Sequence, residues 1–255
     1  MLKIQQFVQP KSLQEAYELL QKNRNNQIIA GMLWLKMEDR SIPTAIDLQH
    51  LVSDQIEESD DRFIIGANVT LRMFETHPAL NQWMHHVCRD SVKDIVGVQF
   101  RNLATVGGSV YARFGFSDVI CALLACDATI ILYKGGEKPL EEFVQSPYQR
   151  DILTHIVIPK QSLPRSFVCM RKSATDISTL NLSVVKKKEQ YQFAVGGRPQ
   201  KAICIQLPVE EDMIVAKKLR SLVPCEGNMR ASKEYREALV EALCRKALKK
   251  LEETA

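Results

Sequence analysis

The sequence predicts an α+β protein with two domains that divide near residue 160. Three observations lead to this prediction. Strand and helix patterns alternate over residues 1–160, strand patterns follow one another from 166 to 206, and residues 232–251 form one amphipathic helical pattern. Alternating elements followed by a run of strands are typical of an α+β fold or of separate domains. The predicted domains are residues 1–160, with subdomains at about 1–52 and 53–160, and residues 161–255.

The first subdomain begins with a β-α-β pattern. Residues 3–8 are an extended run, and Ser12 and Glu15 then form a capping box that starts a helix. The apolar spacing of the following residues gives this helix one buried face. Short strands are predicted at residues 27–30 and 44–48, and a glycine ends the first of them.

The second subdomain has more elements and a less regular pattern. Thr70 and either Ser117 or Asp118 are suited to cap the N-termini of helices that precede apolar runs. Residues 101–118 carry glycines and are predicted to be mostly non-helical. The predicted elements are a strand at 63–66, a helix after Thr70, helices at 80–95 and 119–126, a strand at 128–133, a turn at 134–137 and a strand at 155–158.

The second domain is predicted to be an antiparallel meander followed by a helix. A connector at 160–165 leads into strands at 166–170, 178–185, 190–196 and 200–206. The final helix, residues 232–251, has one apolar stripe, which consists of Tyr235, Leu239, Leu243, Ala247 and Leu251. A stripe at this spacing more often packs on a core than binds a partner.

The composition excludes several classes of protein. With 45% hydrophobic and 25% charged residues, the 255-residue chain has the balance of a soluble globular protein. It has no run of about 18 apolar residues and no signal-peptide pattern, so we expect a cytoplasmic protein without a membrane span. The net charge of +4 does not form a basic stripe with aromatic residues, so we expect no nucleic-acid partner.

The seven cysteines and five histidines do not form a metal-binding pattern. The chain has no CxxC pair, no ferredoxin-type run of cysteines and no HExxH sequence. Cysteines on apolar faces behave as small hydrophobic residues in a reducing compartment. We therefore expect no metal ion and no iron–sulfur cluster within this chain.

Two segments centred on glycine are candidates for ligand binding. In the first, residues 28–36, a strand turns at Gly31 into another apolar run. In the second, residues 104–109, Gly107 and Gly108 are flanked by hydroxyl side chains. A double glycine lets the backbone approach a ligand, and successive amides can hold phosphate oxygens, so a pyrophosphate would fit. The same pattern also fits an ordinary turn.

Absent motifs narrow the chemistry. No GxGxxG follows a strand, which disfavours a Rossmann-type dinucleotide site, and no GxxxxGK[ST] of a P-loop occurs. The chain has no GxSxG nucleophile motif and no acid/base pair that stands out. The residues alone therefore give no candidate for a catalytic side chain.

The order of several short motifs resembles the FAD-binding (medium) subunits of the xanthine dehydrogenase and carbon monoxide dehydrogenase family of molybdenum hydroxylases. The resemblance covers nearly the whole chain, and its most specific element is RNLATVGG at residues 101–108. The other matching segments are the capping box near residue 12, the loop at 28–36, Ile65–Ala67 with Thr70, Ser117–Asp118, Asp176–Ser178 with Asn181, Ala194–Gly197 and Arg230–Ser232.

This resemblance implies an FAD-binding domain of the vanillyl-alcohol oxidase type, followed by a small α+β domain with an antiparallel sheet. It implies that the flavin's pyrophosphate lies between the two glycine-centred loops. Arg171 or Lys172 is a candidate to stabilise an anionic reduced flavin. The implied FAD-binding residues are Ile28, Ile29, Ala30, Gly31, Met32, Leu33, Trp34 and Leu35, then Thr105, Val106, Gly107, Gly108 and Ser109, and finally Asp118, Leu153 and Lys172.

The resemblance also implies an electron-transfer role within a complex. A partner subunit with the molybdenum cofactor would oxidise the substrate, and another with [2Fe–2S] clusters would pass electrons to FAD in this chain, which would reduce NAD or another acceptor. Two alternatives remain: a stand-alone flavin oxidoreductase and a flavin-free scaffold subunit. The second arises because Met32 stands where the family has a second glycine. Phe114 and Phe116 also depart from the family's usual proline in that stretch, and they would either shield the flavin or pack.

Overall fold

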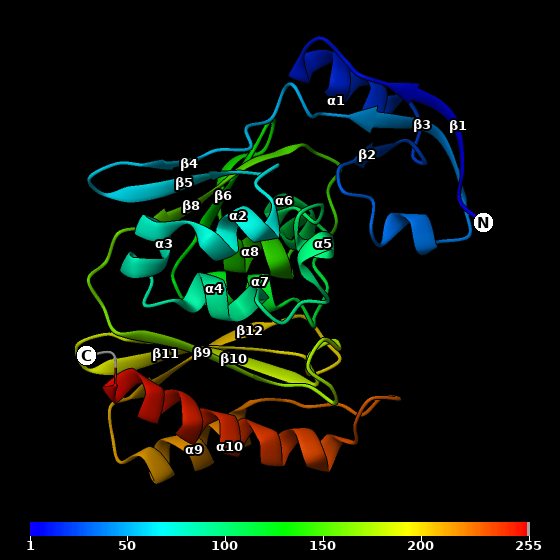
Figure 1. The fold of residues 1–255 in the computed structure, drawn as a ribbon. Coiled ribbons are helices and arrows are strands. Elements are labelled where there is room, and N and C mark those ends of the chain that lie inside the picture. The colour runs from blue at the N-terminus through cyan, green and yellow to red at the C-terminus, as the bar shows by residue number, and fades with distance from the viewer. Residues whose placement is uncertain (254–255) are drawn as a thin grey trace.

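The computed structural model describes residues 1–253, so the last two residues of the predicted second domain lie outside the described chain. The elements form three layers, each built on its own sheet (Figure 1). Among the described residues, no helix is both long and apolar enough to cross a membrane.

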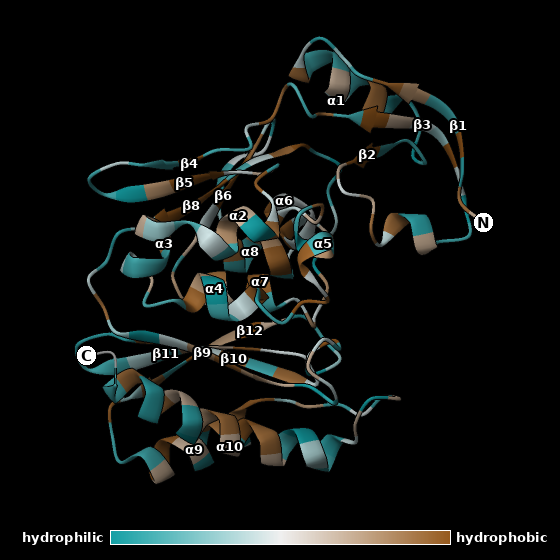
Figure 2. Cartoon of the chain, in the orientation of Figure 1, coloured by the Kyte–Doolittle hydropathy of each residue, from teal (hydrophilic) through white to brown (hydrophobic). Residues whose placement is uncertain are grey.

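The first layer is a three-stranded parallel sheet with one helix. Its strand order is β1-β3-β2. Helix α1 begins after Ser12, whose hydroxyl accepts a hydrogen bond from the Glu15 amide at 3.1 Å, so the predicted helix start is confirmed. The other half of the capping box is replaced, because the Glu15 carboxylate accepts from the Lys11 amide at 2.7 Å rather than from that of Ser12. In β3, the central strand, Ile42, Ala45 and Ile46 are fully buried and supply its hydrophobic stretches (Figure 2). The elements are β1 (Lys3–Val8), α1 (Leu13–Lys22), β2 (Gln27–Ile29), the 3-10 helix η1 (Leu35–Met37) and β3 (Ser41–Asp47).

The second layer is a five-stranded antiparallel sheet whose order is β4-β5-β8-β6-β7. Strand β8 lies at its centre, although it comes about ninety residues after β5 in the chain. The strands are β4 (Ile56–Glu58), β5 (Arg62–Gly66), β6 (Thr129–Leu132), β7 (Gly136–Pro139) and β8 (Leu153–Pro159). The predicted turn at 134–137 therefore includes the start of a strand.

Short helices fill the space between this sheet and the third layer (Figure 1). The prediction of one helix over 80–95 is wrong, because His85 and His86 have positive φ values of 47° and 62° and separate two helices. The prediction that 101–118 is mostly non-helical is confirmed, since ten of its eighteen residues lie outside helices, but it missed the short helix α6. The helices are α2 (Leu71–Thr76), α3 (Pro78–Trp83), α4 (Val87–Val92), α5 (Val98–Arg101), α6 (Val106–Tyr111), α7 (Asp118–Leu124) and α8 (Leu140–Gln145).

The third layer is an antiparallel meander in the order β12-β11-β10-β9, as the strand pattern predicted. Helix α7 packs on one face of this sheet, and α10 packs on the other. The predicted apolar stripe of α10 is largely buried in the second hydrophobic core, whereas Tyr235 is half exposed. Helix α9 was not predicted. The elements are β9 (Arg165–Met170), β10 (Leu180–Lys186), β11 (Gln190–Gly196), β12 (Ile203–Pro208), α9 (Asp212–Leu222) and α10 (Lys233–Glu252).

Candidate functional site

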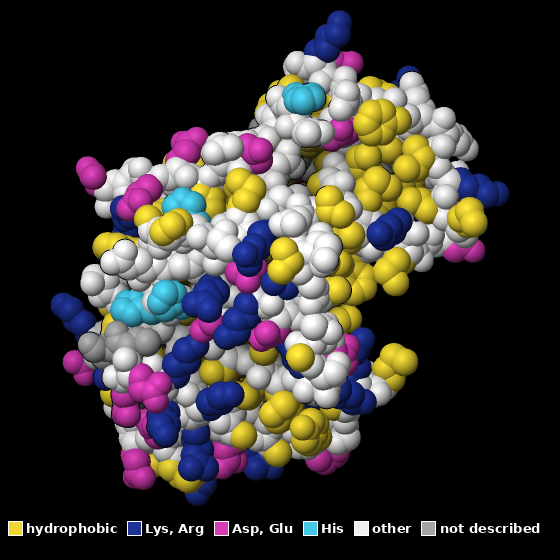
Figure 3. Space-filling view, viewed as in Figure 1, with side chains coloured by type: hydrophobic (Ala, Val, Ile, Leu, Met, Phe, Trp, Pro, Cys, Tyr) yellow, Lys and Arg dark blue, Asp and Glu magenta, His cyan; other side chains and the backbone are white. Residues whose placement is uncertain are grey.

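A cavity of about 460 Å³ lies where the three layers meet, a volume typical of small-molecule sites. Both glycine-centred segments line it, together with residues 171 and 175–178 from the third layer. The surface is hollowed where the first layer overhangs the others, and hydrophobic side chains surround this hollow (Figure 3). The structure therefore brings the two predicted segments to one site.

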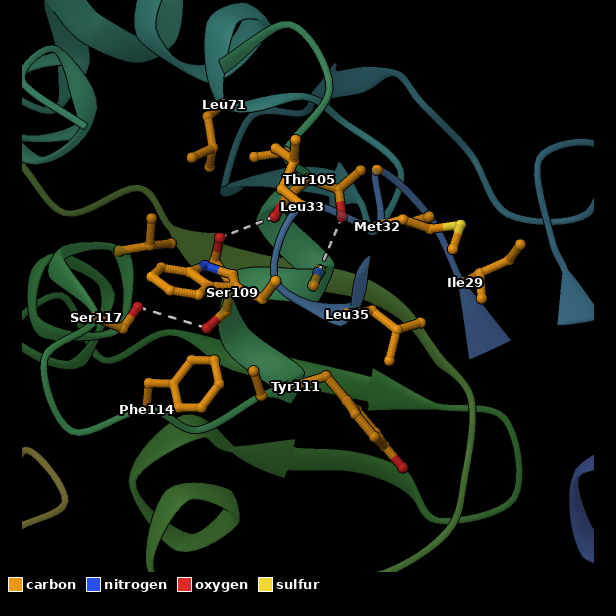
Figure 4. A pocket seen from close by; sticks show the side chains of 18 of the residues that line it. Ile29, Met32, Leu33, Leu35, Leu71, Thr105, Ser109, Tyr111, Phe114 and Ser117 are labelled. Atoms are coloured by element: carbon orange, nitrogen blue, oxygen red, sulfur yellow. Dashed lines mark hydrogen bonds between the residues drawn. The ribbon is translucent and has the colours of Figure 1, made fainter. Parts of the chain in front are cut away.

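The first loop, residues 28–35, follows β2 and forms one wall of the cavity (Figure 4). Gly31 lies against the second segment so closely that a Cβ atom here would be 2.0 Å from the Leu103 carbonyl oxygen. The next residue, Met32, has a φ of 57°, which is the left-handed conformation that favours glycine. Within residues 1–253, none of the amides from Gly31 to Trp34 donates a backbone hydrogen bond. The loop therefore offers four free N–H donors to a ligand.

The second segment is the start of helix α6 rather than an open loop. The Thr105 hydroxyl caps the helix by accepting a hydrogen bond from the Gly108 amide at 3.0 Å. The amides of Val106 and Gly107 donate to the carbonyls of Val69 and Ala67 at 2.8 and 3.0 Å, and that of Ser109 donates to Thr105. All four amides are satisfied within the protein, so the predicted phosphate nest does not form here. The free amides lie on the first loop instead.

The two glycines of this segment have different roles. A Cβ at Gly107 would lie 2.5 Å from Ala67, so this glycine is required by packing. A Cβ at Gly108 would meet only the Thr105 hydroxyl, at 2.9 Å, and Gly108 is exposed on the cavity wall. Gly108 therefore presents bare backbone to a ligand. Val106 is fully buried and does not line the cavity.

Asp118 lies in the cavity wall, but its carboxylate already has three partners. It accepts hydrogen bonds from Arg171 at 2.6 Å, from Ser178 at 2.7 Å and from Asn181 at 2.6 Å. Burial raises the pKa of the Asp118 carboxyl, and Arg171 and the other two donors oppose that shift. This cluster joins α7 to the third layer and fixes the segment after Arg171.

Two predicted FAD-binding residues remain, Leu153 and Lys172, and only one of them lines the cavity. Leu153, the first residue of β8, lines the cavity, whereas Lys172 does not. Its neighbour Arg171 does line it, but the guanidinium is engaged by Asp118 and by the Asp176 carbonyl at 2.6 Å. In this structure neither Arg171 nor Lys172 presents a free cation to the cavity.

Two arginines that the sequence analysis did not predict as site residues also line the cavity. Arg150 donates hydrogen bonds to carbonyls at the end of α1 and in the following turn, among them those of Leu20 and Asn26 at 2.5 and 2.9 Å. Arg40 forms an ion pair with Glu38 at 2.7 Å. Because the guanidinium of Arg150 already donates to backbone carbonyls and that of Arg40 is paired with Glu38, we expect the amides of the first loop to supply the hydrogen bonds to an anion in the cavity. Nothing in the sequence near Arg150 signals this role.

An aromatic cluster closes one end of the first loop. The rings of Phe114 and Phe116 are stacked with centroids 5.1 Å apart and planes 8° apart. Trp34 contacts them with centroid distances of 6.1 and 5.9 Å. All three residues line the cavity, and Trp34 and Phe114 remain 43% and 40% exposed. We call these three residues the aromatic platform.

Comparison with known families identifies the class of protein. Residues 2–161 match the family described as the FAD binding domain in molybdopterin dehydrogenase. This match covers well over half of the chain, and the chain belongs to that family. The resemblance found in the short motifs is thereby confirmed.

Individual relatives extend the match beyond residue 161. The chain is 26% identical to the glyceraldehyde dehydrogenase medium chain of Sulfolobus acidocaldarius, over 96% of this chain and 97% of the relative. It is 29% identical to the nicotinate dehydrogenase FAD-subunit of Eubacterium barkeri, over 50% of this chain and 45% of the relative. A chain of carbon monoxide dehydrogenase from Hydrogenophaga pseudoflava has the same fold, with a TM-score of 0.87 and 18% identity over 98% of both chains.

Proposed function

We propose that this chain is the FAD-binding, electron-transfer subunit of a molybdenum hydroxylase. A partner subunit with [2Fe–2S] clusters would deliver electrons, and another with the molybdenum cofactor would oxidise the organic substrate. NAD or another acceptor would take the electrons from this subunit. The names of the relatives, a medium chain and an FAD-subunit, support a role beside other subunits.

The observation that carries the proposal is the row of free amides opposite Gly108. The amides of Gly31 to Trp34 have no backbone acceptor among the described residues, and they line the same cavity as the bare backbone of Gly108. Pyrophosphate oxygens are strong hydrogen-bond acceptors, and backbone amides hold them without a lysine or an arginine. We infer that the pyrophosphate of FAD binds between these two segments.

The other residues would position the two ends of the cofactor. We infer that Leu153, whose side chain is almost fully buried, lies beside the isoalloxazine ring. Asp118 would act on the cofactor indirectly, because its carboxylate is committed to Arg171, Ser178 and Asn181. When bound, FAD supplies the ability to exchange electrons one at a time or in pairs. We also infer that residues 1–160 form a flavin domain of the vanillyl-alcohol oxidase type, with residues 161–255 as a second domain.

The test is flavin retention by the purified chain. The chain is mixed with excess FAD and desalted, and the visible absorbance and the protein concentration are measured. We expect about one flavin per chain. Absence of retained flavin, both alone and after co-expression with the partner subunits, would contradict the proposal.

A second candidate function is a flavin-free scaffold subunit. The observation that favours it is the left-handed backbone of Met32, a conformation that favours glycine, which is also the residue that the family resemblance implied here. The two candidates are separated by the same experiment, because a scaffold would assemble with the partner subunits and remain colourless in this chain.

A further inference from the structure

We propose that the aromatic platform, Trp34, Phe114 and Phe116, holds the adenine ring of the dinucleotide by stacking. This inference rests on the proposed binding of FAD. It goes further because it assigns one ring of FAD, the adenine, to a cluster that includes Phe114 and Phe116, for which the family resemblance implied no role in binding.

The first step is the position of the platform relative to the free amides. Trp34 is the last of the four residues with free amides, so its indole ring is attached at one end of the proposed pyrophosphate site. A dinucleotide carries one ring system on each side of its pyrophosphate. If the isoalloxazine lies beside Leu153, the adenine must lie on the other side of the phosphates. The cavity has other aromatic side chains, among them Tyr111, but its hydroxyl accepts a hydrogen bond from the Asp151 amide at 3.0 Å, two residues before Leu153. The platform is the aromatic surface next to Trp34, at the far end of the first loop.

The second step is that the platform is held in place before a ligand arrives. Gly115 lies between the two phenylalanines, and its carbonyl accepts a hydrogen bond from the Gly197 amide at 2.7 Å. A Cβ at Gly115 would be 2.0 Å from the Gln200 carbonyl oxygen, so this segment is pressed against the third layer. The Phe116 carbonyl accepts a further hydrogen bond from Asn181 at 3.1 Å. Such fixed aromatic rings bind a ligand ring with little loss of conformational entropy.

The third step is the mode of stacking. The centroids of the three rings are 5.1–6.1 Å apart. Paired aromatic rings lie about 4.5–7 Å apart, so two rings with a third between them would be on the order of 9 Å apart or more. The platform therefore has no slot for a fourth ring. Trp34 and Phe114 are 43% and 40% exposed, and the adenine would lie on these exposed faces.

The experiment measures how variants of the full chain bind ADP and FMN, the two halves of FAD, by calorimetry. Phe114→Ala removes an exposed ring, and Phe114→Leu keeps the apolar bulk without a π face. Phe7→Ala is the matched control, because Phe7 is 57% exposed on β1 and does not line the cavity. Because loss of one stacked aromatic ring weakens the binding of a base, we expect Phe114→Ala to weaken ADP binding by roughly tenfold. Phe114→Leu should fall between this variant and the wild type, and FMN binding should change less than about twofold.

A spectroscopic measurement reports contact with the platform directly. The chain has two tryptophans, so Trp83→Phe leaves Trp34 as the single tryptophan, whose emission is selected from that of the six tyrosines by the excitation wavelength. Trp83 does not line this cavity. We expect ADP to change the Trp34 emission, because adenine would lie on the indole.

Each outcome supports or overturns the inference. Weaker ADP binding with unchanged FMN binding supports it. Weaker FMN binding with unchanged ADP binding assigns the platform to the isoalloxazine and overturns it. A wild type that retains FAD, with variants that bind both probes equally well, overturns the adenine site while the proposed function stands. A wild type that binds ADP through Phe114 but never retains FAD supports the adenine site and overturns the proposed function.

Discussion

Met32 has a backbone conformation that residues with a side chain avoid, and two substitutions measure its cost. Its φ of 57° lies in the left-handed region, which costs an L-residue about 1–2 kcal/mol. Glycine avoids this cost, but it loses about 0.4–1 kcal/mol because it makes the unfolded chain more flexible. The Met32 side chain also packs against Ile29, Ile42 and Ala45, and any substitution that shortens it loses this contact.

The comparison of Met32→Gly with Met32→Ala separates the backbone from the side chain. Both variants lose the same packing, so that loss nearly cancels between them. The difference between the strain and the flexibility leaves the glycine variant more stable by about 0.5–1 kcal/mol. Urea unfolding curves of the two variants, followed by circular dichroism, measure this difference.

The same pair tests the first loop as a phosphate site. Glycine relaxes the backbone and keeps every amide, so we expect Met32→Gly to bind FAD at least as tightly as the wild type. If the alanine variant were the more stable of the two, as at a loop residue with negative φ, the strain argument would be refuted. If the glycine variant also bound FAD more weakly, the side chain of Met32 would be part of the site.

Three further changes test the frame around the cavity. Gly31→Ala places a Cβ against a backbone carbonyl, so we expect a loss of FAD retention and of more than about 2 kcal/mol of stability, whereas Gly97→Ala, which faces only a flexible side chain, should be tolerated in the same unfolding and desalting assays. Asp118→Asn leaves the buried guanidinium of Arg171 without an anion, which we expect to lower the free energy of unfolding by about 3–5 kcal/mol; a loss under about 1 kcal/mol in urea would contradict the role of this pair. Burial acts to raise the pKa of Glu75, but hydrogen bonds from its two arginine partners outweigh burial and hold it below the ordinary 4.5, so its stabilisation is present above pH 4.5 and is lost as the pH falls further. Unfolding midpoints of wild type and Glu75→Gln should therefore differ at pH 7 and converge near pH 3, and a gap that is equal at both pH values would refute this assignment.

Local chemistry was enough to predict the starts of four of the ten α-helices in the described part of the chain. Ser12, Thr70, Ser117 and Ser232 each precede an apolar pattern, and each accepts a hydrogen bond from an amide of the first helical turn. The strands of the third layer were also predictable, because their alternation and turns are local signals. Caps and strand patterns act over a few residues, so they can be seen in the sequence.

Helix α6 could not be predicted in this way. Its sequence, VGGSVY, contains two glycines and two β-branched residues, which disfavour a helix. The helix forms because Thr105 caps it and because its first two amides donate to Val69 and Ala67, more than thirty residues earlier. The break at His85 and His86 has no glycine or proline to signal it, so the sequence read as one helix.

The sequence predicted which two segments form the candidate site, but it did not predict which of their backbone amides are free to bind a ligand. Glycines at 31 and 107–108 marked the segments. The satisfied amides of one and the free amides of the other depend on which carbonyls the fold brings near. Arg150 lines the cavity because its partners, the carbonyls at the end of α1, are some 125 residues away in the chain. Contacts at such separations leave no local pattern.

The central place of β8 has a consequence for how the chain is made. This strand pairs with β5 on one side and β6 on the other, so it joins the two halves of the middle sheet. A nascent chain that has not yet exposed residues 153–159 outside the ribosome has two unconnected strand pairs with open edges. Leu153, a wall of the cavity, arrives with that same strand. Synthesis must therefore pass residue 159 before the middle sheet can close, and the cavity that Leu153 lines can form only after that point.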